Sequence, residues 1–547
     1  MSQSPHTDTF ANDRLPHPDR MPDLLLEREE LRYPAHVNAV SVLLDAHVER
    51  GDGERRCIVA PGAIDLTYRD LQNAANRIAN VLVRDLGVVP GNRVLLRAYN
   101  SPMFAACWLA VLKAGAIAVS TMPLYRATEL RNIVEKARVN VALCDSRLAP
   151  ELQAATEASP IPTIYFGGDE PGGLEARMDA QSDRFRNVET SAADVAMIAF
   201  TSGTTGAPKA AMHFHRDLLA SCDTYARYVL QPRRDDLFAG SPPLAFTFGL
   251  GGLLLFPLYA GAATLLLEKA GPAELLQAIE SFGVTTLFTA PIAYRTMTTM
   301  LEGYDISTLR TCVSAGETLP KPVWDAWYAK TGIAILDGIG STEMLHIFIG
   351  SPVDEVRSGS TGRVVPGYVA EIHDEEGARL PAGAVGRLAV RGPTGCKYLD
   401  DPRQASYVQN GWNYPGDAYR MDEDGYCWYV ARTDDMIVSA GFNVSGPEVE
   451  QALLEHPEIH ECAVVAKPDP AHDTHIVKAF VVLRTPSEDP QRTSAELIAF
   501  CKTQIAAFKA PREIEFVTEL PRTQTGKVQR FKLRDRASGE GDAEPLR

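Results

Sequence analysis

A loop of glycine and hydroxyl-bearing residues that ends in a lysine is the segment of this chain best suited to chemistry. It reads Thr201-Ser202-Gly203-Thr204-Thr205-Gly206-Ala207-Pro208-Lys209 and directly follows an apolar run over residues 195–200. Glycines let a backbone fold tightly around an anion, hydroxyl and N–H groups donate hydrogen bonds to its oxygens, and Lys209 adds a positive charge. We therefore expect this loop to hold the phosphates of a nucleoside triphosphate.

Two other interpretations of the loop are weaker. A P-loop has two glycines separated by four residues and then Lys and Ser or Thr; this loop lacks that spacing, which disfavours a kinase or a GTPase. A flexible linker rich in Ser, Thr and Gly is seldom flanked by a strand of the buried type. A phosphate-binding turn at the end of a strand explains both composition and position.

A second turn carries hydroxyls and one carboxylate. It reads Asp337-Gly338-Ile339-Gly340-Ser341-Thr342-Glu343. Magnesium in nucleotide sites usually takes one or two carboxylates together with oxygens of the substrate, so Glu343 is a natural Mg²⁺ ligand. Taken alone, an exposed glutamate in a turn explains this segment equally well.

Charged residues suited to a sugar and to phosphate lie nearer the C-terminus. Asp417 can accept hydrogen bonds from both hydroxyls of a ribose, and the planar fork of Arg432 can brace the sugar or a phosphate. Lys527 follows a Gly/Thr turn, and residues 501–536 hold nine Lys and Arg against four acidic residues. Singly, ordinary surface ion pairs explain these residues. In a chain of net charge -16 their concentration indicates a surface that handles anions.

Composition excludes several classes of function. The net charge of -16 argues against nucleic acid or an anionic membrane surface as the main partner. Nine scattered cysteines without a C-x-x-C pair indicate reduced thiols and disfavour zinc. Residues 1–20 lack the apolar core of a signal peptide, and the uncharged stretch 237–267 contains too many Gly and Pro residues for a spanning helix. We therefore expect a cytoplasmic protein.

Apolar runs alternate with helical segments along much of the chain, a pattern typical of parallel sheets covered by helices. We expect strands over residues 93–97, 116–120, 139–144, 263–267, 284–288 and 309–313, and helices over 103–114, 128–137 and 272–281. Short strands and Gly/Pro turns follow over residues 362–417, which indicate a small antiparallel or barrel-like unit. Beyond residue 434 we expect strands over 461–465 and 477–483 and a helix over 494–505.

At 547 residues the chain is too long for one compact core. The prediction is an α/β fold with an N-terminal arm (1–35) and a large domain (36–433). The large domain holds two doubly wound sheets and a small β-barrel subdomain. A small mobile α+β domain (434–547) follows.

The four chemical segments, in this order and at these separations, resemble the adenylate-forming superfamily. This superfamily contains acyl-CoA and aryl-CoA synthetases, adenylation domains of peptide synthetases, and luciferases. The resemblance covers roughly residues 40–535. It implies a reaction in two steps: a carboxylic acid attacks the α-phosphate of MgATP to give an adenylate and pyrophosphate, and the thiol of coenzyme A then displaces AMP. Between the steps the small domain turns about a hinge at Asp434.

The resemblance implies a role for each segment. Residues 201–209 hold the β and γ phosphates, Thr342 contacts the α-phosphate, and Glu343 binds Mg²⁺. Asp417 and Arg432 hold the ribose, and Lys527 bridges the carboxylate and the α-phosphate. In the second step Gly441 and Phe442 come against the site, where Gly441 lines the tunnel for the pantetheine arm. The remaining residues implied at the nucleotide are Gly316, Glu317, Asp337, Gly338 and Ser341.

Residues 341–349 resemble the benzoate-CoA ligase branch, and residues 8–15 resemble 2-aminobenzoate-CoA ligases. The acyl pocket that this implies is lined by Phe246, Phe248, Ala290, Tyr294, Ala315, Gly316, Gly338, Gly340, His346 and Ile349. A flat pocket walled by glycines and aromatic rings suits an aromatic acid, benzoate or 2-aminobenzoate. His346 is equally well explained as a structural buried histidine.

The sequence departs from the family at two places. Ile339 stands where the family often has Tyr, and residues 243–246 lack the His of the family's aromatic gate, which affects local packing only.

Several alternative functions remain. The alternative substrate is a medium-chain fatty acid, and a separate carrier protein is an alternative acceptor. A regulatory ATP-binding protein is disfavoured because Glu343, Asp417, Arg432 and Lys527 are all present. A luciferase-like oxygenase shares every motif. The protein is expected to be a monomer or a homodimer.

Overall fold

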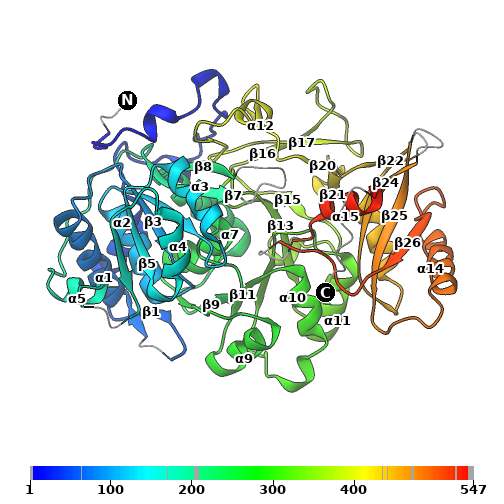
Figure 1. Cartoon of the computed structure of the whole chain (residues 1–547), viewed down its shortest axis with the longest axis horizontal. Coiled ribbons are helices and arrows are strands. Elements are labelled where there is room, and N and C mark those ends of the chain that lie inside the picture. The colour runs from blue at the N-terminus through cyan, green and yellow to red at the C-terminus, as the bar shows by residue number, and fades with distance from the viewer. Residues whose placement is uncertain are drawn as a thin grey trace.

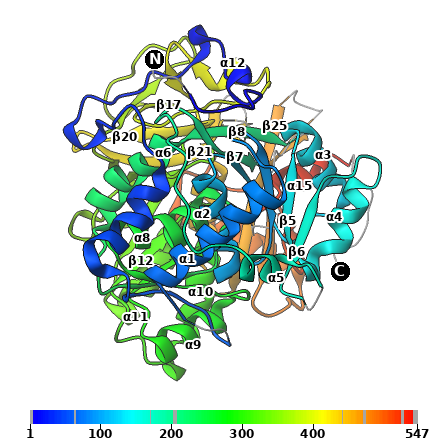
Figure 2. The same ribbon diagram turned by 90° about the vertical axis from the view of Figure 1, so that its left-hand side faces the viewer.

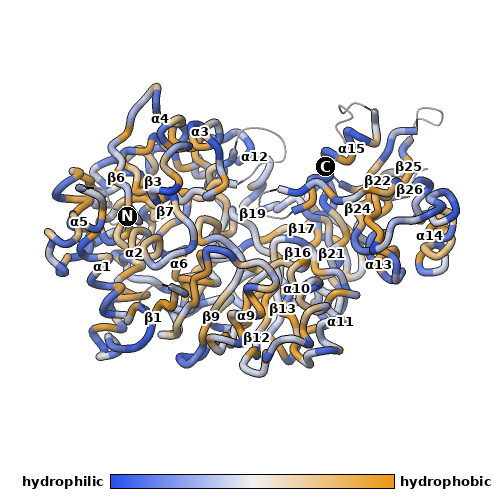
Figure 3. Tube along the Cα trace, turned by 60° about the horizontal axis from the view of Figure 1, so that its bottom comes forward, coloured by the Kyte–Doolittle hydropathy of each residue, from blue (hydrophilic) through white to orange (hydrophobic). Residues whose placement is uncertain are grey.

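Two sheets lie side by side in the N-terminal part of the chain, and a smaller unit follows at one end (Figure 1). The computed structural model describes residues 4–62, 65–168, 171–201, 208–433, 435–439, 442–469, 474–523 and 527–539. Hydrophobic residues concentrate along the strands and the inward faces of the helices, as Figure 3 shows. The parallel strands therefore form the interior, and helices cover them.

The first sheet has the strand order β6-β5-β3-β4-β7-β8. Its strands are β3 (Arg93–Arg97), β4 (Ile117–Thr121), β5 (Val141–Asp145), β6 (Thr163–Phe166), β7 (Val195–Thr201) and β8 (Lys209–Phe214). The helices of this region are α1 (Tyr68–Asn80), α2 (Pro102–Lys113), α3 (Ala127–Ala137), α4 (Ala149–Thr156), α5 (Leu174–Asp179) and α6 (His215–Ser221). β3, β4 and β5 are buried at every position, because helices cover both faces of the sheet. The pairings are parallel except that of β7 with β8, which is antiparallel.

The second sheet begins as a parallel sheet and ends as an antiparallel one. Its parallel part holds β1 (Arg56–Val59), β9 (Leu237–Gly240), β10 (Ala263–Leu265), β11 (Thr286–Thr289), β12 (Thr311–Ser314) and β13 (Ile335–Gly340), with β2 (Leu66–Thr67) at its edge. The accompanying helices are α7 (Thr247–Leu250), α8 (Phe256–Ala260), α9 (Pro272–Phe282), α10 (Pro291–Thr298) and α11 (Lys321–Thr331). The predicted alternation of strands and helices, and the α/β class, are confirmed.

The antiparallel part extends this sheet beyond β13. It holds β14 (Ile347–Gly350), β15 (Gly362–Val364), β16 (Val369–His373), β17 (Val385–Arg391), β18 (Val408–Gln409), β19 (Trp412–Asn413), β20 (Asp417–Met421) and β21 (Tyr426–Arg432), with α12 (Gln404–Tyr407). The sequence predicts a barrel-like unit here, but among the described residues these strands pair in an open order and do not close into a barrel. β14 pairs with β13, so the strands continue the second sheet.

The C-terminal unit has a sheet and a hydrophobic core of its own. Its elements are β22 (Ile437–Ser439), β23 (Phe442–Val444), α13 (Gly446–Leu454), β24 (Ile459–Asp469), β25 (Thr474–Leu483), α14 (Pro490–Gln504), β26 (Glu513–Phe516) and α15 (Arg530–Ser538). β24 and β25 pair antiparallel, and β26 lies parallel to β25. Figure 1 shows this unit in orange and red beside the second sheet.

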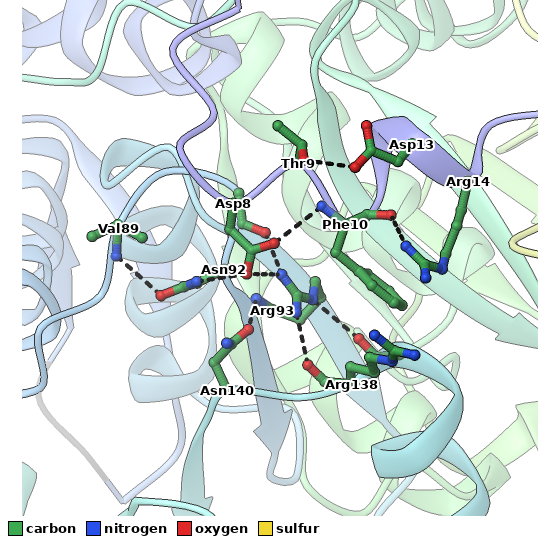
Figure 4. Close-up of polar contacts among 12 residues, drawn as sticks. Asp8, Thr9, Phe10, Asp13, Arg14, Val89, Asn92, Arg93, Arg138 and Asn140 are labelled. Carbon is green, nitrogen blue, oxygen red and sulfur yellow. Dashed lines mark hydrogen bonds and ion pairs between the residues drawn. The ribbon is translucent and has the colours of Figure 1, made fainter.

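The N-terminal arm ties the first sheet to the antiparallel strands of the second. Asp8 accepts hydrogen bonds from Arg93 at 2.5 Å and from Asn92 at 2.9 Å, and the ring of Phe10 lies 4.6 Å from the Arg93 guanidinium (Figure 4). Further along the arm, Leu24 forms a parallel bridge with Gly392 after β17. Figure 2 shows the arm running along β17 and α12. The arm is therefore packed at both of its ends.

The uncharged stretch 237–267 forms β9, α7, α8 and β10 and joins the interior of the second sheet. No helix within the described ranges is long and apolar enough to cross a membrane.

Three buried histidines should make the stability of the protein depend on pH. Burial lowers the pKa of His213 to about 4 and the pKa values of His215 and His346 to about 3. Unfolded chains bind these protons below a pH of about 6.5, whereas the folded protein does not. The free energy of unfolding should therefore fall by about 1.4 kcal/mol per pH unit for each histidine between pH 6.5 and about 4.

Urea unfolding at pH 7, 6 and 5 measures this slope. His346→Leu should lower this slope by the contribution of one proton, because the variant lacks the imidazole whose pKa burial lowers. His475→Gln, at an exposed histidine, is the matched control and should leave the slope unchanged. Equal slopes for the wild type and His346→Leu would contradict the assignment.

Candidate active site

The antiparallel pair β7 and β8 presents the glycine-rich loop. Thr201 and Lys209 lie directly opposite each other in the register of the pair, so the two ends of the loop are adjacent at the carboxyl end of β7. Residues 202–207 lie outside the described residues. The Nζ atom of Lys209 lies 5.4 Å from the centre of the Tyr398 ring. Both ends of the loop are therefore held by a buried strand pair.

The turn after β13 holds the predicted hydroxyl and carboxylate groups. Met344 N–H donates to Ser341 O and Leu345 N–H donates to Thr342 O, both at 3.2 Å, which closes the turn. Glu343 is 8% exposed, and its Oε1 accepts a hydrogen bond from the Tyr398 hydroxyl at 2.5 Å. Glu343 is therefore not the exposed turn residue of the alternative interpretation.

Asp417 and Arg432 are neighbours on adjacent strands. They lie opposite each other in the register of β20 and β21, and Nη1 of Arg432 lies 3.3 Å from both carboxylate oxygens of Asp417. Gly416 has φ 87°, and a Cβ there would lie 2.7 Å from Nη2 of Arg432. The glycine gives Arg432 the room to lie against Asp417.

Part of the C-terminal unit contacts the loop that follows β12. Val528 N–H donates to Oε1 of Glu317 at 3.2 Å, and Arg522 Nη1 lies 3.7 Å from the same oxygen. Burial raises the pKa of Glu317, and the positive charges of Arg522 and Lys527 oppose this rise. Lys527 is therefore close to Glu317, on the side of the second sheet where its strands end.

A second contact between the C-terminal unit and the second sheet centres on Glu461 of β24. Its carboxylate accepts from Arg522 at 2.5 Å and lies 3.6 Å from Nη2 of Arg295 on α10. Arg295 also donates to the carbonyl of His460 at 2.5 Å. Glu461 thus joins two arginines from different parts of the chain, a contact that no sequence motif indicates.

His346 lies within a cluster of aromatic rings. The ring centres of Phe256, Tyr225 and Phe248 lie 4.6, 5.3 and 5.8 Å from that of His346. Within the described ranges, neither ring nitrogen of His346 meets the distance and angle of a hydrogen bond. A Cβ on Gly251 would lie 2.3 Å from the imidazole, so the glycine makes room for the ring. His346 is therefore buried among three aromatic rings.

The other residues predicted for the acyl pocket lie in several places. Phe246 packs against Tyr125, with ring centres 6.5 Å apart, in the core of the first sheet. Ala290 precedes α10, and Ala315 follows β12. Ile349 on β14 pairs with Ile339 on β13, close to the predicted Gly338 and Gly340. Gly340 is a glycine for steric reasons, since a Cβ there would lie 2.7 Å from the backbone of His346.

Tyr294 does not join the aromatic cluster. Its hydroxyl donates to the carbonyls of Leu287 and Val313, and its ring packs against Trp327 with centres 5.2 Å apart. It is fully buried between the second sheet, α10 and α11. Tyr294 is therefore a core residue that is held by hydrogen bonds to two neighbouring strands.

Other predicted residues lie near the cluster or outside the described residues. Asp337 is half-buried, and its loss of solvent raises the pKa of its carboxyl well above the usual range; Oδ1 has no hydrogen-bond partner. Gly316 follows β12 with φ 95°. Asp434 and Gly441 lie outside the described residues, and Phe442 begins β23. The sequence predictions omitted Tyr398 and His213, because each of them contacts residues 341–343 only through the fold.

Comparison with known proteins adds two independent findings. The family described as "AMP-binding enzyme" matches residues 44–397, and "AMP-binding enzyme C-terminal domain" matches residues 448–527. Benzoate–CoA ligase of Thauera aromatica is 34% identical over 519 residues, which cover 92% of this chain and 97% of that protein. Acyl-coenzyme A synthetase ACSM5, mitochondrial, of Mus musculus is 33% identical and covers 86% of this chain and 84% of that protein.

A solved structure extends the likeness to the fold. The crystal structure of the anthranilate CoA ligase AuaEII in complex with anthranoyl-AMP superimposes with a TM-score of 0.88 at 34% sequence identity. The superposition covers 93% of this chain and 99% of that chain.

Loss of the Glu461 charge should loosen the contact between the C-terminal unit and the second sheet. In Glu461→Gln, Arg295 and Arg522 lose their common anion, and amides of residues 520–528 should exchange hydrogen about threefold faster, the effect of roughly 0.6 kcal/mol. Hydrogen exchange followed by mass spectrometry measures this, with the amides of β17 as an internal reference. Glu488→Gln, at an exposed glutamate of the same unit, is the control. An unchanged exchange rate in Glu461→Gln would show that these ion pairs do not stabilise the contact between the C-terminal unit and the second sheet.

Proposed function

Since this chain belongs to the AMP-binding enzyme family and is an AMP-forming acyl- or aryl-CoA ligase, we propose that its acid is aromatic: benzoate or 2-aminobenzoate. The observation that carries the proposal is the cluster of Phe248, Phe256 and Tyr225 around His346. Rings arranged around a neutral imidazole suit a flat substrate that has one polar edge. The likeness to the anthranilate CoA ligase and to the benzoate–CoA ligase supports it.

We assign the first step to residues of the two sheets and to Lys527 of the C-terminal unit. A carboxylate oxygen of the acid forms a bond to the α-phosphorus of ATP, and the bond from that phosphorus to the bridging oxygen breaks and releases pyrophosphate. Residues 201–209, with Lys209, hold the β and γ phosphates, and Thr342 holds the α-phosphate. Lys527 neutralises the charge that builds between the carboxylate and the α-phosphate. Asp417 and Arg432 orient the ribose, and Gly316, Glu317, Asp337, Gly338 and Ser341 surround the nucleotide.

The residues present fit a magnesium ion held mainly by the nucleotide. Glu343 offers one carboxylate, which is 8% exposed and lies beside Thr342. The described part of the chain has no group of three or more side chains that could hold a metal by themselves. Magnesium at phosphates needs only one or two protein carboxylates. When bound, the ion would neutralise charge on the phosphate oxygens.

In the second step the thiol of coenzyme A attacks the carbonyl carbon of the adenylate, a thioester bond forms, and AMP leaves with the electrons of the broken bond. We propose that residues 434–547 turn about Asp434 between the steps, which withdraws Lys527 and brings Gly441 and Phe442 to the site. Residues 36–433 would form the domain that binds ATP and the acid.

A medium-chain fatty acid is the second candidate substrate, because the mitochondrial acyl-coenzyme A synthetase ACSM5 is nearly as similar to this chain as the benzoate–CoA ligase. A separate carrier protein is a possible acceptor in place of coenzyme A.

Pyrophosphate release measured across a panel of acids tests the aromatic assignment. The panel holds benzoate, aminobenzoates, hydroxybenzoates and fatty acids of four to ten carbons, each with and without coenzyme A. We expect benzoate or 2-aminobenzoate to give a kcat/KM at least about tenfold above every fatty acid, about 1.4 kcal/mol of discrimination. Turnover confined to fatty acids would overturn the assignment.

Replacement of Lys527 should separate the two half-reactions. Lys527→Ala should lower the rate of adenylate formation by at least about a hundredfold, because the charge at the reacting oxygens is lost. Thioester formation from supplied aryl-adenylate should stay within about threefold of wild type, because Lys527 has left the site in that step. Lys532→Ala, at an exposed lysine of α15, is the control. Equal loss of both half-reactions would refute the role of Lys527.

A further inference from the structure

Three consecutive residues of the turn after β13 are each held by one side chain from elsewhere in the chain. The carbonyl of Thr342 lies 2.8 Å from Nε2 of His213. Oε1 of Glu343 accepts from the Tyr398 hydroxyl, and the carbonyl of Met344 accepts from Oγ1 of Thr394 at 2.8 Å. This turn carries both the hydroxyl assigned to the α-phosphate and the carboxylate assigned to magnesium.

The side chains that hold the turn come from two backbone segments that are bonded to each other. Met212 N–H donates to Lys397 O at 2.8 Å, and Leu399 N–H donates to Ala210 O at 2.9 Å. Residues 397–399 therefore run beside β8, the strand that starts at Lys209. The glycine-rich loop and the turn after β13 are thus connected through one strand.

The protonation state of His213 follows from its partner. A carbonyl oxygen can only accept a hydrogen bond, so Nε2 of His213 carries the proton and donates it to Thr342. Burial, together with the positive charge of Lys397, lowers the pKa of His213 to about 4. The imidazole is therefore neutral, and Nδ1 has no hydrogen-bond partner.

A fully buried ion pair fixes the surroundings of His213. The side chains of Lys397 and Asp217 are 0% exposed, and Nζ lies 2.9 Å from Oδ2. The same Oδ2 accepts from Phe214 N–H at 3.0 Å, and Nζ also donates to Gly395 O at 2.8 Å. Such a pair costs desolvation energy and seldom adds stability over an apolar pair. Here it fixes the backbone on both sides of the imidazole.

The turn itself needs support from outside. It passes through Leu345 at φ 71°, a left-handed conformation that is unfavourable for leucine. Such conformations persist only where surrounding contacts impose them. The hydrogen bond from His213 acts directly on the carbonyl that closes this turn, because the same Thr342 oxygen also accepts from Leu345 N–H.

We propose that His213 is a positioning residue for the adenylate-forming step. Its Nε2–H fixes the backbone of Thr342, and thereby directs the Thr342 hydroxyl to the α-phosphate and keeps Glu343 beside it. The inference rests on the proposed role of Thr342. Errors of about 1 Å in such positions cost about a hundredfold in rate.

Exchange of labelled pyrophosphate into ATP, measured at saturating ATP with the acid most active in the panel, tests the role. His213→Leu should lower kcat by about ten- to a hundredfold while the KM for the acid stays within about twofold. In His213→Gln an amide N–H replaces Nε2–H, and kcat should return to within about threefold of wild type. His215→Leu is the control for the loss of a buried imidazole. His215 accepts a hydrogen bond from Ala39 N–H, so this variant should lower Tm without lowering kcat.

Two results would overturn the proposal: wild-type kcat in His213→Leu, or equal kcat in His213→Gln and His213→Leu. If His213→Leu does not fold, His213→Asn replaces it, because the shorter amide ends near the position of Nδ1 and cannot reach Thr342. The kcat of His213→Asn should be at least about tenfold below that of His213→Gln. Any acid that forms an adenylate can serve in this assay. The role of His213 can therefore be tested even if the substrate is not an aromatic acid.

Discussion

The antiparallel pairing of β7 with β8 is the constraint on which the site depends. The other pairings of the first sheet are parallel and need a crossover between strands, whereas β8 follows β7 directly in the sequence and pairs with it antiparallel. β8 begins at Lys209, next to the end of the loop, and a later residue of the strand, His213, contacts Thr342 beside the second sheet. One strand thus connects the end of the loop with the turn after β13.

The layers of the fold follow from sequence pattern, but the connections between them do not. Parallel strands buried on both faces leave continuous apolar runs, and for this reason the predicted strand over residues 93–97 has the bounds of β3. Short antiparallel strands, such as β16 over residues 369–373, are also visible in the sequence. The expected barrel is an open extension instead, because nothing in the short strands indicates that β14 will pair with the last parallel strand.

Sequence alone brings candidate groups together only where they share one segment, as Thr342 and Glu343 do in the turn after β13. Asp417 and Arg432 stand fifteen residues apart in sequence, and only the register of β20 and β21 makes them neighbours. Tyr294 shares an aromatic character with Phe248, yet the direction of α10 places it in the core, which composition cannot reveal. His213 and Tyr398 escape sequence analysis for the same reason, since their partners are more than fifty residues away.

The N-terminal arm contacts residues that lie near it in the sequence and residues that lie far from it. Arg93 and Arg138, which surround Phe10, are synthesised soon after it, so the first half of the arm can dock while the rest of the chain is still being made. Leu24 must wait for Gly392, more than three hundred residues later. Closing so long a loop is entropically costly, and the contact of Leu24 must offset that cost. The arm thus joins an early part of the chain to a late one.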